Sequence, residues 1–436
     1  MKQLFYTLAL VLVSIGMASA QEDVYPAKEF KGQLFITNGT IHIGNGQVVE
    51  NGTIEINNGK IIKVSNNAVT PSSGAKVIDA KGKQVYPGLI LPSSDLGLKE
   101  IGSGVRGSND VLEIGDLNPS VRSIVAYNTD SKFINVLKAQ GVLLAGVVPQ
   151  GGTISGSSSV VQTDAWNWED AAYRMDGGIH LNMPSFFVRP GGRRRAPGQP
   201  PAEDPIKQAV EKVAELKSFF TQARAYAAET SHASTNLKLQ AVQGLFNKKQ
   251  KLFVHADQVK QMLVAIDFVK DFGFDVVIVG GSESYQIADL LKQNNIPVIL
   301  NQQHSLPTME DDDVDQPYKT PAILQQAGVL FALNDEDGTT RYRNLSYNAG
   351  TAATYGLTKE QALQAITLSS AKILGIDDIT GSIEAGKDAN IVISDGDILD
   401  MKSSKVIHAF IQGREVSLEN KQSQLYERYK QKYGIN

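Results

Sequence analysis

The fold is decided by the stretch Gln84-Val-Tyr-Pro-Gly-Leu-Ile-Leu-Pro-Ser-Ser-Asp-Leu-Gly97. It predicts a short buried strand that runs through Pro87-Gly88 and ends in small polar residues. Short alternating strands precede it, whereas strand and helix patterns alternate after it. In a parallel α/β barrel, the residues just past such a strand form the floor of the active site. Ser93, Ser94 and Asp95 stand at this point.

The region before this strand predicts a small antiparallel sheet. Residues 32–80 contain four short segments in which apolar and polar residues alternate. Asn-Gly pairs predict tight turns between them, and they begin at Asn38, Asn45, Asn51 and Asn58. Residues 381–393 and 405–413, near the other end of the chain, again show strand and turn patterns. We expect the two ends to pair, so that a composite small domain brackets the large one.

The middle of the chain predicts repeated parallel βα units. The clearest run consists of strands at 251–256, 274–281, 296–300 and 328–335, with helices at 257–272, 283–293 and 320–327 between them. The Gly- and Ser-rich segment 150–159 predicts a polar loop that follows a strand. The Pro-, Gly- and Arg-rich segment 189–201 predicts an exposed loop.

Composition excludes several classes of protein and site. The chain is 42% hydrophobic and 20% charged, which is typical of a soluble globular protein. Its formal charge of −4 gives no reason to expect nucleic acid or an anionic membrane surface as a partner. It has no cysteine, which excludes disulfides, a thiol nucleophile and a Cys-ligated zinc site.

The first twenty residues predict a secretory signal. Lys2 is followed by an apolar run over residues 4–17 and by the small-x-small cleavage site Ala18-Ser-Ala20. This run is shorter than the roughly 20 residues that span a bilayer, and no later stretch is long and apolar enough. We therefore expect an exported protein, periplasmic or secreted, without a membrane span.

Long blocks of sequence then resemble the amidohydrolase superfamily, most closely its imidazolonepropionase- and prolidase-like branch. The blocks near the start are Asn58-Gly-Lys-Ile-Ile, Val77-Ile-Asp-Ala-Lys-Gly-Lys and Val85-Tyr-Pro-Gly-Leu-Ile. Those near the end are Tyr355-Gly-Leu-Thr-Lys-Glu-Gln-Ala, Ala371-Lys-Ile-Leu-Gly and Gly381-Ser-Ile-Glu-Ala-Gly-Lys-Asp-Ala-Asn-Ile-Val. The resemblance implies an α/β fold: a (β/α)8 TIM-like barrel with a composite β-sandwich formed by both termini.

The expected domain boundaries follow from this resemblance. Residues 1–20 are the signal peptide, 21–86 and 377–417 form the β-sandwich, 87–376 form the barrel, and 418–436 form a terminal helix.

Enzymes of this superfamily use one or two divalent metals to activate water against a C–N or related bond. The resemblance places the ligands at the ends of barrel strands, but several positions differ here. The first ligand pair, His-x-His, falls on Ser93 and Asp95, and the acid that precedes it is replaced by Leu91. The ligand position of strand six falls on Gly280 or Gly281, which cannot bind a metal.

The remaining positions carry plausible ligands. His255 falls on the histidine of strand five, and the acid of strand eight maps to Asp335, with Glu336 and Asp337 as alternative registers. The resemblance therefore implies at most one divalent metal, zinc or similar, held by Asp95, His255 and Asp335. Asp335 and His255 are the expected catalytic residues. No nucleotide or organic cofactor is implied.

Each of these residues also has a structural interpretation. His255 is otherwise a histidine satisfied within the fold, and Asp95 otherwise bonds to the backbone N–H groups of the next segment. Three residues near strand ends are expected to bind substrate, with surface placement as the alternative: His304, Arg341 and Arg343. Four other histidines are interpreted as structural: His42, His180, His232 and His408.

Two functions stay open from the sequence. In the first, the protein is an exported hydrolase that acts on C–N bonds of a small molecule, such as an amino-acid or dipeptide-like derivative, with a reduced metal site. In the second, it is a catalytically inactive binding protein or a non-catalytic subunit paired with an active relative. Association with itself or with an amidohydrolase relative fits either function.

Overall fold

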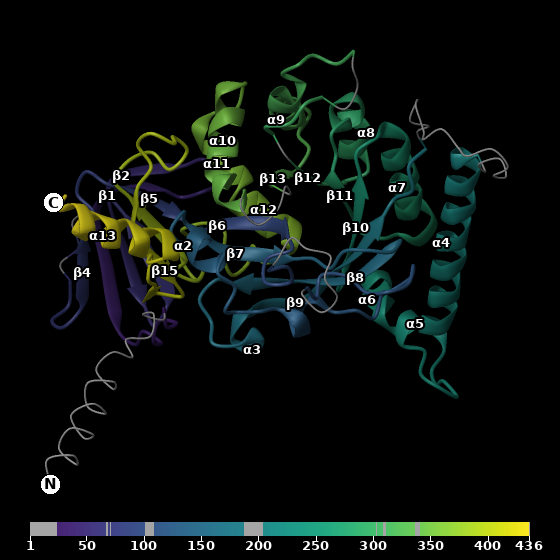
Figure 1. Cartoon of the computed structure of the whole chain (residues 1–436), viewed down its shortest axis with the longest axis horizontal. Helices are drawn as coiled ribbons and strands as arrows, with labels where there is room; N and C mark the ends of the chain where they lie inside the picture. The colour runs from purple at the N-terminus through teal and green to yellow at the C-terminus, as the bar shows by residue number, and fades with distance from the viewer. Residues whose placement is uncertain are drawn as a thin grey trace, which may run out of the picture.

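The computed structural model describes residues 24–66, 69, 71–100, 109–186, 204–301, 303–307, 311–335 and 341–435. Within them the strands form two eight-stranded sheets (Figure 1). One, the terminal sheet, is built from both ends of the chain, and the other, the barrel sheet, from its middle. The predicted signal segment 1–20 and the segment 189–201 lie outside the described residues. Among the described helices, none has the length and apolar character needed to cross a membrane.

The terminal sheet confirms that the two ends of the chain pair. Its strand order is β16-β15-β14-β5-β1-β2-β3, with β4 beside β1. The ends meet where β5 and β14 pair antiparallel, with Val85 opposite Ile393. Leu34, Ile54 and Phe410 share one buried core, so both ends are needed to fill it. The strands are β1 (Gln33–His42), β2 (Val48–Asn57), β3 (Lys60–Ser65), β4 (Lys76–Asp79), β5 (Gln84–Pro87), β14 (Ile391–Ser394), β15 (Val406–Ile411) and β16 (Arg414–Glu415).

Two of the Asn-Gly pairs do not form the predicted turns. Asn38-Gly39 lies inside β1 and Asn51-Gly52 lies inside β2, and Gly39 pairs with Gly52 across the ladder. Asn38 and Asn51 have φ angles of 61° and 50°, in the left-handed region that Asn tolerates better than most residues. The register shifts on both sides of Gly39, so the two pairs bend neighbouring strands together. Asn58-Gly59 does form the predicted turn, between β2 and β3.

The barrel sheet confirms the α/β barrel, with one strand reversed. Its order is β13-β12-β11-β10-β9-β8-β7-β6, and neighbours are parallel except that β8 is antiparallel to β7 and β9. The sheet nearly closes where β13 returns to β6, since the Ser93 amide donates a hydrogen bond to Asn334 Oδ1 at 3.2 Å. The strands are β6 (Leu89–Ser94), β7 (Val142–Val147), β8 (Ile154–Gln162), β9 (Ala172–Asn182), β10 (Lys251–Ala256), β11 (Val276–Gly280), β12 (Val298–Leu300) and β13 (Phe331–Leu333).

The segment 150–159 is not the loop that its composition predicts, because most of it belongs to the buried strand β8. Its small hydroxyl side chains find partners inside the fold. Ser157 Oγ donates to Asp176 Oδ1 at 2.8 Å, and the Asp176 amide donates to Ser159 Oγ at 2.9 Å. A buried polar group costs little when it is hydrogen-bonded. A serine-rich run can therefore serve as an interior strand.

Helices pack around the barrel sheet (Figure 1). In α7, Met262, Ala265 and Ile266 are buried, the spacing of an amphipathic helix with one face on a core. The helices are α2 (Ile134–Lys138), α3 (Trp168–Ala171), α4 (Pro205–Ala228), α5 (Leu237–Ala241), α6 (Gln243–Phe246), α7 (Val259–Phe272), α8 (Ala288–Gln293), α9 (Gln316–Ala327), α10 (Leu345–Thr354), α11 (Lys359–Ala365), α12 (Leu368–Leu374) and α13 (Lys421–Tyr433). Three short 3₁₀ turns complete the described elements: η1 (Ser123–Ala126), η2 (Ser284–Ile287) and η3 (Tyr342–Asn344).

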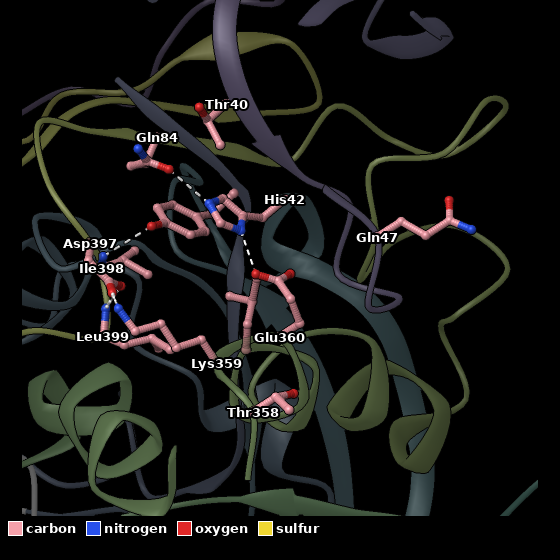
Figure 2. Close-up of polar contacts among 12 residues, drawn as sticks. Thr40, His42, Gln47, Gln84, Thr358, Lys359, Glu360, Asp397, Ile398 and Leu399 are labelled. Carbon is pink, nitrogen blue, oxygen red and sulfur yellow. Dashed lines mark hydrogen bonds and ion pairs between the residues drawn. The ribbon is translucent and has the colours of Figure 1, made fainter. Parts of the chain in front are cut away.

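His42 joins the terminal sheet to the barrel (Figure 2). Its Nδ1 atom lies 2.6 Å from Glu360 Oε1 on α11, and its Nε2 atom lies 2.9 Å from Gln84 Oε1 on β5. Its ring stacks on Tyr86, with centroids 4.5 Å apart. Burial of the ring opposes protonation, but the hydrogen bonds to Glu360 and Gln84 and the nearby negative charge outweigh it and raise the pKa of His42 above its usual value.

Candidate active site

The barrel interior changes from apolar to polar toward the carboxyl-terminal ends of its strands. Phe253, Ile299 and Ala332 belong to the apolar interior core. Side chains two residues apart point to the same face of a strand, and two residues further along stand His255, Asn301 and Asn334. The polar side chains therefore meet at one end of the barrel, where active sites of this architecture lie.

His255 pairs with His180, a histidine that was interpreted from the sequence as structural. His180, near the end of β9, is buried, and its Nδ1 atom lies 2.9 Å from His255 Nε2. The His180 ring also stacks on Phe253, with centroids 4.8 Å apart. Burial lowers the pKa of His255 to about 4 and, together with the neighbouring His255, the pKa of His180 well below its usual value. Both rings are therefore neutral near pH 7, and one donates to the other.

Asp95 is held by a tyrosine from the far end of the barrel sequence. The Tyr342 hydroxyl donates to Asp95 Oδ1 at 2.6 Å and accepts from the Asp95 amide at 3.1 Å. Both residues are buried. Lys99 Nζ lies 3.9 Å from Asp95 Oδ2. The Asp95 carboxylate is therefore already hydrogen-bonded to Tyr342 and close to Lys99.

Asn334 connects the last strand of the barrel to its first. This buried side chain accepts a hydrogen bond from the Ser93 amide and donates one to Asn301 Oδ1 at 2.9 Å. The first ligand position of the superfamily pattern, Ser93, therefore contributes its backbone to the closure of the barrel.

Asp335 follows Asn334 and is completely buried. Its Oδ2 atom accepts a hydrogen bond from Asn348 Nδ2 at 3.1 Å, on α10. Its Oδ1 atom has no hydrogen-bond partner within the described structure, although Arg341 Nε lies 3.5 Å away. Most buried polar atoms have a hydrogen-bond partner, so this oxygen can still accept one from a ligand or a water. The alternative acids, Glu336 and Asp337, lie outside the described residues.

The other residues expected to bind substrate lie further out. His304 is exposed, and its Nε2 atom lies 2.7 Å from Thr351 Oγ1 on α10. Arg343 is exposed on η3. Of the three predicted substrate contacts, only Arg341 is thus placed beside Asp335.

The described donors do not fit the divalent metal that the resemblance implies. No group of three or more His, Asp or Glu side chains could hold a metal ion within the part of the chain that the structure describes. The structure therefore does not bring Asp95, His255 and Asp335 together as a ligand set. At the sixth strand position, β11 ends at Gly280, where a Cβ atom would lie 2.6 Å from Asp257 Oδ1.

Four residues of this site were not found from the sequence: His180, Tyr342, Asn334 and Asn348. A signal for His180 was present, because Ile179 and Leu181 flank it in an alternating pattern that predicts a strand. Tyr342 and Asn348 carry no local signal, because their partners lie on other elements of the fold.

Comparisons with known proteins agree on one family. A model of the amidohydrolase family matches residues 312–416. The solved structure of an amidohydrolase from Thermotoga maritima is 27% identical, with a TM-score of 0.74 over 88% of this chain and 99% of that one. A Xaa-Pro dipeptidase with bound methionine has the same fold, with a TM-score of 0.53 and 17% identity over 88% of this chain and 100% of its own.

A curated relative extends the similarity. The amidohydrolase tasK from Hapsidospora irregularis is 23% identical over 370 residues, which are 76% of this chain. The chain spans only 36% of the length of that relative.

Proposed function

The chain belongs to the amidohydrolase superfamily, and on that premise we propose that it hydrolyses a carbon–nitrogen bond in a small polar compound, such as an amino-acid or dipeptide derivative. The proposed site is the polar end of the barrel, between Asp335 and the His180–His255 pair. One observation carries the proposal. Asp335 is buried at the end of the last barrel strand and keeps its Oδ1 atom without a hydrogen bond among the described residues.

Asp335 acts as the general base in this proposal. It takes a proton from water while the water oxygen attacks the substrate carbonyl carbon. The C–N bond of the tetrahedral intermediate then breaks, and the nitrogen takes up the proton, so that a carboxylic acid and an amine are released. Asn348 holds the other oxygen of Asp335 and so fixes the direction of the base. The described donors form no metal site, so no metal-dependent step is assigned.

Arg341 is the proposed substrate anchor. Its guanidinium lies beside Asp335, and a guanidinium binds a carboxylate through two parallel hydrogen bonds. An amino-acid derivative that presents its carboxylate to Arg341 brings its amide near the base. The contacts expected of His304 and Arg343 stay predictions.

A non-catalytic binding protein, or a non-catalytic subunit of an active relative, is the second candidate. The observation that favours it is the replacement of superfamily ligands at the barrel end. Ser93 and Gly280 offer no imidazole, and Asp95 is engaged by Tyr342. Such a barrel keeps a polar ligand site while lacking the means to activate water.

Amine release from a panel of N-acetyl amino acids and dipeptides separates the two candidates. We expect wild-type protein and the surface control Tyr426→Phe to release amine, and Asp335→Asn to be slower by at least about 100-fold with unchanged circular dichroism. Full activity in Asp335→Asn would show that the base is misassigned. Binding of a panel compound without turnover in the wild type would favour the second candidate.

Export remains part of the proposal, because it rests on residues 1–20, which the structure does not describe. Mass spectrometry of protein recovered from a bacterial periplasm tests it. Cleavage before Gln21 is the expected result, and an intact amino terminus in the cytoplasm contradicts it.

A further inference from the structure

A cavity lies at the opposite end of the barrel from the proposed active site. It lies between residues 129–138, which include α2, the residues that follow β8, and the segment 24–26. Thr163 marks its position, because the Thr163 amide donates to the Leu143 carbonyl at the start of β7. The cavity has a volume of about 520 Å³, within the range of roughly 300–1,000 Å³ that holds small-molecule ligands.

Two aromatic rings stand at this cavity with most of their surface in water. Tyr25 is 66% exposed and Trp166 is 63% exposed, and their ring centroids lie 6.0 Å apart at an angle of 36°. Burial of such rings is strongly favourable, and an exposed aromatic pair beside a cavity is typical of a binding surface. The Tyr25 and Trp166 rings together form one side of the cavity, which we call the aromatic wall.

Buried charges hold this wall in place. Asp164 Oδ1 accepts a hydrogen bond from Lys138 Nζ at 2.8 Å, and Asp164 Oδ2 accepts one from the Ala27 amide at 2.8 Å. Arg414, from the terminal sheet, donates to the Ala27 carbonyl at 2.8 Å and to Asp164 Oδ2 at 3.2 Å. Ala27 is thereby fixed two residues after Tyr25. On the other side, Thr129 Oγ1 donates to the Trp166 carbonyl at 3.2 Å. These contacts hold the Tyr25 and Trp166 segments at the cavity without a bound ligand.

The charges of the lining cancel. Lys132 and Lys138 give two positive charges, and Asp130 and Asp164 give two negative ones, a sum of zero. Lys138 and Asp164 also neutralise each other directly. Arg414, which does not line the cavity, lies 3.2 Å from Asp164 Oδ2, so the buried charges around Asp164 are already paired with one another. Hydroxyl and amide groups complete the polar lining, from Thr129, Ser131 and Asn135.

We propose that this cavity binds a neutral saccharide. A sugar ring offers an apolar C–H face, which packs on Trp166 and Tyr25, and a rim of hydroxyl groups, which exchange hydrogen bonds with the polar lining. The site is independent of the reaction at the other end of the barrel.

The chain offers a direct measurement, because its only two tryptophans are Trp166 and Trp168. Trp168→Phe leaves Trp166 as the sole indole, whose emission then reports on the cavity. Cellobiose, maltose, xylobiose and N,N′-diacetylchitobiose are the probes. We expect a saturable change in emission with at least one of them, with a dissociation constant in the millimolar range, around 1 mM.

Calorimetry with the same saccharide tests the wall itself. Trp166→Ala and Tyr25→Ala, both at exposed side chains, are expected to weaken binding at least tenfold, while Trp168→Phe leaves it unchanged. The proposal is overturned if none of the four disaccharides gives a saturable signal, or if both alanine variants bind as well as the wild type. Preferential binding of choline or acetate would overturn the assigned ligand class.

Discussion

His180 Nδ1 lies 2.9 Å from His255 Nε2 inside the barrel end. Because both rings are neutral near pH 7, this contact is one hydrogen bond in which a single proton lies between two nitrogen atoms. The lone pair on the accepting ring is then occupied. A neutral imidazole needs that lone pair to bind a metal, so the pair itself competes with metal coordination by one of its two members.

Removal of either imidazole is expected to destabilise the protein. His255→Ala and His180→Ala each leave a buried nitrogen without its partner, at a cost of about 1–3 kcal/mol in the free energy of unfolding. Because the two rings share one bond, the double variant should lose less than the sum of the single losses. Urea unfolding of the four proteins gives the coupling free energy. Additive losses would show that the two rings do not interact.

Tyr342→Phe tests the second polar contact of the barrel end. The change leaves Asp95 Oδ1 and the Asp95 amide without the hydroxyl that serves both, so we expect a loss of about 1–3 kcal/mol in the free energy of unfolding. Tyr426→Phe, on the exposed face of α13, is the control and should change nothing. Equal stability of the two variants would mean that water replaces the hydroxyl.

Metal content tests the donor arrangement at the barrel end. We expect protein purified without chelator to hold well below one equivalent of zinc, and its melting temperature to be unchanged by EDTA, because a bound metal stabilises the folded state by mass action. Atomic emission spectroscopy and thermal unfolding are the measurements. Stoichiometric zinc that disappears in His255→Ala would restore the ligand set that the resemblance implies.

The contact between the terminal sheet and the barrel should respond to pH. The pKa of His42 is raised in the folded state, so the folded protein binds the proton more tightly than the unfolded chain does. This stabilisation is fully present below the unfolded pKa of about 6.5 and is lost as the pH rises through the folded pKa. We therefore expect the unfolding free energy of the wild type, measured relative to that of His42→Gln, to fall between pH 6 and pH 8. His180 and His255, whose pKa values are lowered, have the opposite dependence, which is common to both proteins and cancels in this difference.

His408 provides the control for this measurement, because it contacts Glu415 within the terminal sheet rather than the barrel. His408→Gln should keep the pH dependence of the wild type. Loss of the dependence in His408→Gln, or its persistence in His42→Gln, would assign it to a different group.

Much of the fold follows from local pattern, and particular elements show why. Alternating apolar residues predict a strand at β2, where Ile54 and Ile56 are buried, because burial on one face of a strand fixes a period of two. The single strand predicted through Pro87-Gly88 is wrong: the chain forms two strands there, β5 in the terminal sheet and β6 in the barrel sheet. Apolar alternation does not predict β8, because its serines are buried through hydrogen bonds to other segments of the chain, such as the bond from Ser157 to Asp176. Asn51-Gly52 shows a related limit, since its backbone preference fits a bend within paired strands as well as a turn.

The site was less accessible from sequence than the fold. His255 and Asp335 were predicted as site residues because the superfamily pattern marks their positions at strand ends. The partners that define their chemistry were not found, because Tyr342 and Asn348 reach the barrel end from elements that follow the last strand. The residue types in the sequence predict which side chains could bind a metal or substrate. Contacts in the folded structure decide which of these side chains are already hydrogen-bonded to other residues.

The antiparallel pair of β5 and β14 has a consequence for the order of folding. During synthesis, β5 emerges more than 300 residues before its partner, so its free edge remains open while the whole barrel is made. An unpaired strand edge is a site of aggregation. The barrel can begin to assemble first, and β14 to β16 then complete the terminal sheet, in which the first strands of the chain lie. A truncation just before Ile391 would therefore leave a complete barrel sheet joined to a terminal sheet whose β5 edge is unpaired and prone to aggregation.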